Sequence, residues 1–505
     1  MATPAHSSRP RLLVHRIALF AAATGLAGCV AALLRFPDTP TPEPEAIRPA
    51  LMWLGIAGAW TWAALTVVWA TMVRGRGPGF VSTATLVIVV AMLARILVVI
   101  GHEPRLSDDI YRYIFDGRNL AAGVNPYLVT PRQRMEELGL EVPAVPDPSF
   151  ELPPRLLDAD EPRWTGEAAL IGRVNNPEMA TIYLPTSQYL FGGLGWVANG
   201  WELTRPASMA RLYRAGFVGV ECLMLLVLAT ALHRADRSAW WLTLYAWHPL
   251  ALAEIAGSGH QDILGAGLLA ATAWTARTPI WTACLAAGGL VKPFIIPVAA
   301  LLLRGRSWRS WALSLATGAV IVAGMGAPLL LAPEGQPFRN LESTSSRFSA
   351  KWAYFGSVYE PALALLERVD PIGDDAEAWR ARERHEAIAR GICLVVFASV
   401  AVVIFAAVRC PWSSTRTLLV AMVLCSTTAH PWYLLWALVL APRAPSATLW
   451  VLSLTLPLAY APLWTGGPWS APAWVLVAAY GPVYTVGVVE LGRRITGGMR
   501  DKGTP

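Results

Sequence analysis

Long apolar runs separated by short basic clusters dominate the pattern of the chain. The clearest runs lie at residues 51–73, 81–100, 215–232, 311–332 and 392–408. Their lengths are comparable to the ~20 helical residues needed to cross the hydrocarbon layer of a membrane. The pattern therefore predicts an all-α fold, a polytopic transmembrane helical bundle with about 11–13 membrane segments.

Composition supports the same fold class. Of the 505 residues, 55% are hydrophobic and only 15% are charged, whereas about a quarter of the residues in soluble domains are charged. The net charge of +7 would fit a nucleic-acid partner, but the Lys and Arg residues lie in short clusters between the apolar runs. Such clusters are typical of cytoplasmic loops. We therefore expect no nucleic-acid partner and a multi-pass protein of the inner (plasma) membrane.

The basic clusters also predict a topology. Placing them in the cytoplasm leaves the chain outside the cytoplasm after three helices. A helix at 238–257 brings His260 to the same side, provided that segment 182–208 is interfacial or re-entrant. The predicted parts are three N-terminal helices (1–100), an extracytoplasmic loop (101–185), transmembrane helices with polar segments (186–332), a second extracytoplasmic segment (333–390), C-terminal helices (391–491) and a cytoplasmic tail (492–505).

The first helix is expected at about residues 17–34. Residues 26–29 within it resemble a lipoprotein processing box, but the chain stays apolar through Leu34, which favours a membrane helix. The six cysteines lie almost entirely in or beside apolar runs, without disulfide or metal-ligand spacing, and we interpret them as packing residues.

The stretch SDDIYRYIFDGRNLAAGVNPY, residues 107–127, is the most charged part of this apolar chain. Asp109, Arg112, Tyr113 and Asp116 share one face of a predicted helix, which the following Gly and Asn-Pro end. A helix start needs only one capping group, and Ser107 can serve.

Two neighbouring carboxylates, Asp108 and Asp109, suit a general base or a site for a divalent cation such as Mg or Mn. Arg112 and Arg118 would keep them ionised or reach an anionic donor, and Tyr113 is a further substrate-binding candidate. The sequence leaves open which of the two aspartates is the base.

Four ionisable residues interrupt later apolar segments: Glu254, His260, Asp262 and Lys292. Such residues within membrane spans are functional candidates. The first three either line a cavity or brace helices. Lys292 needs an anion, which is either the phosphate of a lipid-linked substrate or a structural partner, Glu254 or Asp262.

Other polar residues carry weaker signals. Arg95 either snorkels to the interface or is functional, and His430, before a Pro, is either a packed imidazole or a ligand. Asp374 and Asp375 are interpreted as a helix start. In the second extracytoplasmic segment, Arg347 and Lys351 are substrate-binding candidates; they lie in the aromatic-rich stretch RFSAKWAYFGSVYEP.

Several motifs together resemble the bacterial C-type integral-membrane glycosyltransferases, in particular the polyprenol-phosphate-mannose-dependent mannosyltransferases. They are the 107–127 stretch, TIYLPTSQYLF, HPLALAEIAGSGHQDIL and AHPWYLLW. Three positions depart from the family pattern: Thr186 where a second Pro is usual, His248 where Asn is common, and Gln261 in place of Asn.

The resemblance implies a C-type fold with a catalytic first extracytoplasmic loop, and an inverting transfer of a hexose, mannose by resemblance. The donor would be a polyprenyl-phosphate sugar and the acceptor an extracytoplasmic glycan or lipid. Asp108 or Asp109 would be the base, His260 and Asp262 would line the site, and Lys292 and His430 would meet the donor phosphate. The alternative is a transporter or flippase of a lipid-linked saccharide, although the sequence shows no inverted internal repeat.

Overall fold

The computed structural model describes residues 8–37, 44–72, 79–139, 166–272, 278–331, 334–373, 378–465 and 471–500. Within these ranges all named elements are helices. Two isolated β-bridges connect Tyr354 and Phe355 with Thr428. The all-α prediction is thus confirmed for the described part of the chain. The chain divides into two compact units, residues 1–351 and 352–505, which are described separately below.

Eight segments of the described residues are long and apolar enough to cross a membrane. Seven belong to α1 (Ser8–Leu33), α2 (Pro44–Thr71), α3 (Phe80–Gly101), α8 (Pro206–Arg234), α14 (Trp308–Leu330), α17 (Ala378–Ala407) and α22 (Ala473–Arg500). The eighth, Ala447–Trp464, runs through α20 (Ala447–Thr455), η5 (Leu456–Tyr460) and α21 (Ala461–Thr465). The protein is therefore a multi-pass membrane protein by length and composition. The larger count of 11–13 segments stays a prediction.

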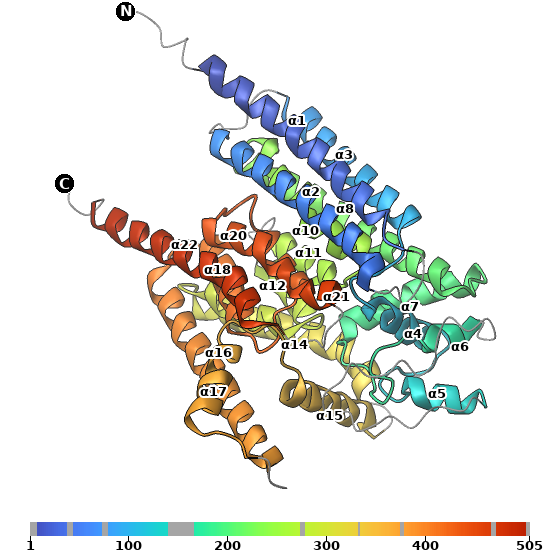
Figure 1. The fold of residues 1–505 in the computed structure, drawn as a ribbon. Coiled ribbons are helices and arrows are strands. Elements are labelled where there is room, and N and C mark those ends of the chain that lie inside the picture. Colours follow the sequence, from blue (N-terminus) through green and yellow to red (C-terminus); the bar gives the residue numbers. More distant parts are fainter. Residues whose placement is uncertain are drawn as a thin grey trace, which may run out of the picture. The chain divides into compact units, whose positions relative to one another are not determined.

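In the first unit, α1, α2, α3 and α8 lie side by side (Figure 1). α3 and α8 are joined inside the layer by an ion pair, in which Arg95 Nε lies 2.6 Å from Glu221 Oε2, with both side chains fully buried. Arg95 also donates to the carbonyl of Ala246 at 2.9 Å. The snorkelling interpretation of Arg95 is therefore wrong, because its charge is neutralised within the bundle.

The single helix expected at 238–257 is also wrong. The structure has four short pieces there: η1 (Ala239–Leu242), α9 (Thr243–Ala246), α10 (Pro249–Ala251) and the π-helical η2 (Leu252–Gly257). Pro249 lacks an amide hydrogen, so it starts a new helix rather than continuing one. His248 caps that start, because its Nδ1 accepts from Leu250 N at 3.2 Å. Next come α11 (Asp262–Thr272), α12 (Thr278–Gly289), η3 (Pro293–Ile295) and α13 (Ile296–Leu303).

Helices pack closely in the described parts of the segment that follows α3, residues 102–139 and 166–200. This segment carries α4 (Asp109–Ala121), α5 (Pro131–Glu137), α6 (Gly166–Ile171) and α7 (Pro185–Gly200). α4 confirms the predicted helix. It crosses α7 where a Cβ added to Gly117 would lie 2.2 Å from the carbonyl oxygen of Phe191, and one added to Gly195 would lie 2.3 Å from that of Gly117. Only glycine permits this approach. At 16 residues, α7 falls short of the ~20 needed for a full crossing.

The first unit ends with α15 (Gln336–Lys351), which packs with α14 around the buried side chain of Tyr127. Asn125 Nδ2 donates to Leu329 O at 2.7 Å, and Asn340 Nδ2 donates to Tyr127 O at 2.8 Å. The Asn-Pro-Tyr sequence that follows α4 is thereby fastened to the later helices.

The second unit contains α16 (Tyr359–Val369), α17, α18 (Pro411–Cys425), η4 (Pro431–Leu434), α19 (Leu435–Leu438), α20, η5, α21 and α22. α16 packs on α17 through a cluster of Tyr359, Ala389 and Cys393. Asp374 and Asp375, which are interpreted above as a helix start, lie outside the described residues, and α17 begins at Ala378. All six cysteines are free.

Candidate active site

The start of α4 separates the two aspartates. Asp108 occupies the N-cap position without a capping hydrogen bond from its side chain. Ser107 Oγ instead accepts from the amide of Asp109 at 3.3 Å. Asp109 thus begins the helix with a carboxylate that is 28% exposed, so it remains accessible to a substrate.

His260 lies between two carboxylates. Its Nδ1 is 3.9 Å from Asp109 Oδ2 and its Nε2 is 3.4 Å from Glu254 Oε2, and the imidazole is fully buried. Gly259 makes this approach possible: it has φ of +79°, and an added Cβ would lie 2.6 Å from Ile110 Cδ1. A side chain there would push the segment carrying His260 away from α4.

Lys292 is paired with Asp262. Its Nζ donates to both carboxylate oxygens at 2.8 and 2.9 Å. Lys292 holds an extended backbone at the N-cap of η3, as expected for a residue that precedes proline. The structural-partner alternative for Lys292 is therefore observed. Its side chain nevertheless keeps 18% exposure.

These residues shift the acidity of Asp109. The pKa of the Asp109 carboxyl is raised to about 6. Burial is the largest cause and the charges of Asp262 and Asp108 act in the same direction, while Lys292 and a hydrogen bond from Asn175 lower the pKa. A carboxylate with a pKa near neutrality suits proton transfer.

We name Asp109 and the four residues grouped with it the acid–base cluster. It comprises Asp109, Glu254, His260, Asp262 and Lys292.

The first turn of α7 joins the segments around the cluster. Ser187 Oγ donates to Gln261 Oε1 at 2.5 Å, Gln188 Nε2 donates to Asp116 Oδ2 at 3.1 Å, and Thr186 N donates to Leu290 O at 3.1 Å. Sequence reasoning missed Ser187 and Gln188, although two adjacent polar residues in a short apolar segment were the available signal. The departures at Thr186 and Gln261 thus have structural roles.

Three predicted residues of α4 have other partners. Arg112 Nε pairs with Asp116 Oδ1 at 2.9 Å, and its Nη1 donates to Met179 O at 2.9 Å. The fully buried ring of Tyr113 stacks on Phe191 with centroids 4.7 Å apart. Arg112 and Tyr113 therefore fix α4 against its neighbouring segments.

Arg118 lies further along α4, and its Nη1 contacts Met209 Sδ at 3.4 Å. This contact fastens the last turn of α4 to α8.

The remaining candidates are Arg347, Lys351 and His430. Arg347 and Lys351 are exposed on α15. His430 belongs to the second unit, where its ring stacks on Trp432 with centroids 4.2 Å apart and lies 5.9 Å from the ring of Tyr354. Substrate binding by these three residues stays a prediction.

A metal site also stays a prediction. Within the described ranges, no group of three or more His, Cys, Asp or Glu residues is arranged to hold a metal ion.

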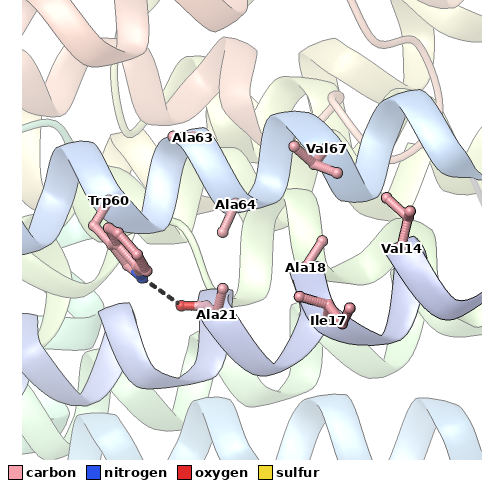
Figure 2. A pocket seen from close by; sticks show the side chains of 8 residues that line it. All are labelled: Val14, Ile17, Ala18, Ala21, Trp60, Ala63, Ala64 and Val67. Atoms are coloured by element: carbon pink, nitrogen blue, oxygen red, sulfur yellow. Dashed lines mark hydrogen bonds between the residues drawn. The ribbon is translucent and has the colours of Figure 1, made fainter.

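Two grooves of the described residues lie elsewhere, between α1 and α2. One has a volume of about 320 Å³ and is lined by apolar residues and Trp60, whose Nε1 donates to Ala21 O at 3.0 Å (Figure 2). The adjoining groove, about 300 Å³, shares Trp60 and reaches Arg35. No residue of the acid–base cluster lines either groove. The candidate site is therefore identified by the chemistry of its polar side chains.

No family model, curated protein or solved structure matches the chain.

Proposed function

We propose that the protein is a membrane glycosyltransferase that transfers a hexose, mannose by resemblance, from a polyprenyl phosphate to a glycan or lipid acceptor outside the cytoplasm. The observation that carries this proposal is the partly exposed Asp109 carboxylate, whose pKa is raised to about 6 beside the buried His260. The motif resemblance suggests the substrate class, and the exposure and raised pKa of Asp109 support its proposed role as the base.

Asp109 is the favoured base because it combines access with a suitable acidity. In the proposed reaction, Asp109 accepts the proton of the acceptor hydroxyl while the hydroxyl oxygen bonds to the anomeric carbon. The bond from that carbon to the phosphate oxygen breaks, and the phosphate leaves with the electron pair. A single displacement of this kind inverts the anomeric carbon.

The other members of the cluster support the charge changes. Glu254 lies on the Nε2 side of the His260 imidazole, and Asp109 lies on its Nδ1 side. Lys292 keeps part of its charge accessible although it is paired with Asp262. Its ammonium group is therefore the proposed contact for the leaving phosphate.

The rival function is transport of a lipid-linked saccharide, which would also use ionisable residues and broken helices. The sequence shows no inverted internal repeat of the kind that many transporters contain.

The test uses the full chain in liposomes with a radiolabelled polyprenyl-phosphate sugar and an extract of candidate acceptors. We expect Asp109→Asn to lower the transfer rate about 10²- to 10⁴-fold, the usual loss for a general base. Asp108→Asn is the matched control, with a smaller loss. Undiminished transfer by Asp109→Asn would show that the base is wrongly assigned. Movement of the intact donor across the bilayer, without transfer, would favour the transporter.

A further inference from the structure

Arg214 of α8 is a fully buried arginine that bonds to backbone carbonyls. Its Nη2 donates to Val99 O at 3.2 Å and to His102 O at 2.6 Å. Its Nη1 donates to Ala256 O at 3.1 Å and to Gly257 O at 3.4 Å. One guanidinium group therefore joins two separate stretches of backbone.

Both stretches are helix ends. Val99 and His102 lie at the C-terminal end of α3, and Ala256 and Gly257 end η2. The last carbonyls of a helix lack intrahelical partners and carry partial negative charge. The planar guanidinium fork, with five donors in fixed directions, can satisfy two such ends at once. A lysine ammonium group, as a single point of charge, cannot span both.

The two helix ends lead directly into the acid–base cluster. After α3 the chain runs through residues 102–108 to Asp109. After η2 it runs through Ser258 and Gly259 to His260. The stem of Arg214 also packs against this turn, because a Cβ added to Gly259 would lie 2.8 Å from Arg214 Cγ. The Arg214 side chain thus contacts the backbone segments that precede Asp109 and His260.

We propose that Arg214 is a positioning residue, which sets the separation of Asp109 and His260 by holding the ends of α3 and η2 together. This inference rests on the proposed function and adds to it a residue that touches no substrate. Small misplacements of reacting groups are costly, since a shift of about 1 Å can lower a rate about 100-fold.

The test compares Arg214→Met and Arg214→Lys with Arg211→Met, a control at an exposed position of the same helix. We expect Arg214→Met to lower kcat about 10- to 100-fold with KM within about threefold of wild type, because positioning affects the chemical step. Arg214→Lys should recover part of kcat, and Arg211→Met should match the wild type.

Hydrogen exchange supplies a readout that does not depend on activity. In Arg214→Met, amide exchange should accelerate in peptides covering residues 102–111 and 255–262, and stay unchanged in α1 and α2. Unchanged kcat, or unchanged exchange in these peptides, would overturn the inference. So would faster exchange throughout the first unit without recovery by Arg214→Lys, because that pattern marks a general loss of stability. If the wild-type chain transfers no sugar, the proposed function fails separately, and the exchange data still decide whether Arg214 holds the two ends.

Discussion

Lys292 donates two hydrogen bonds to the carboxylate of Asp262, and the same lysine lowers the pKa of Asp109 while Asp262 raises it. The two partners of one ion pair therefore act on the proposed base with opposite sign. This relationship allows the electrostatics of the site to be tested without changing the base itself.

In the wild type, a base with a pKa of about 6 must be ionised to act, so kcat/KM should fall about tenfold per pH unit below pH 6. Lys292→Met removes the cation that lowers the pKa of Asp109, so this pH limb should move to higher pH. Asp262→Asn removes a charge that raises the pKa, so the limb should move to lower pH. Both profiles are measured by sugar transfer between pH 4.5 and 8. Shifts in the same direction for both variants would contradict the arrangement.

The close contact of α4 with α7 gives a stability prediction. Gly117→Ala would place a Cβ 2.2 Å from both Phe191 O and Tyr213 Oη, so the helices must separate. We expect a loss of about 1–3 kcal/mol, as for overpacking, seen as a lower midpoint of thermal unfolding in detergent. Gly193→Ala, where nothing lies within 4 Å of the added Cβ, is the control and should match or exceed the wild type. Equal midpoints for the two variants would show that the contact is not rigid.

The sequence predicted the parts that depend on apolar length and helical spacing. It predicted the membrane helices, and it predicted α4 together with its end near Gly123. It also offered Asp262 as a partner for Lys292. These features follow from the spacing of apolar and charged residues along the chain, which a single sequence shows directly.

The errors arose where distant segments decide the outcome. For Arg95 the sequence leaves snorkelling and a functional role open, and it does not indicate the buried ion pair, because the partner Glu221 lies inside an apolar run. The span 238–257 looked continuous because hydropathy does not register how Pro249 restarts a helix. Arg214 received no prediction, since bonds to backbone carbonyls leave no mark on side-chain patterns.

The predicted orientation is testable at exposed positions in a background with the exposed Cys410 replaced by Ser. The basic clusters place Arg347 outside the cytoplasm and Arg234 inside, and both side chains are exposed. A membrane-impermeant maleimide should therefore label Arg347→Cys in intact cells, and should label Arg234→Cys only after permeabilisation. The reverse pattern would invert the topology and place the acid–base cluster in the cytoplasm.

The buried pair between Arg95 and Glu221 gives the largest expected effect on stability. Arg95→Met leaves Glu221 as a charge without its partner at a fully buried position, and Glu221→Met does the same to Arg95. Breaking one side of a buried pair costs about 3–5 kcal/mol.

The double variant Arg95→Met/Glu221→Met leaves no unpaired charge, so it should lose less stability than either single variant. It still forfeits the bond from Arg95 to Ala246 O, and should therefore stay slightly below the wild type. Thermal unfolding of all four proteins in the same detergent closes the double-mutant cycle. If the stability losses of the two single variants simply add in the double variant, Arg95 and Glu221 do not interact. The charges of Arg95 and Glu221 would then have to be balanced by other groups.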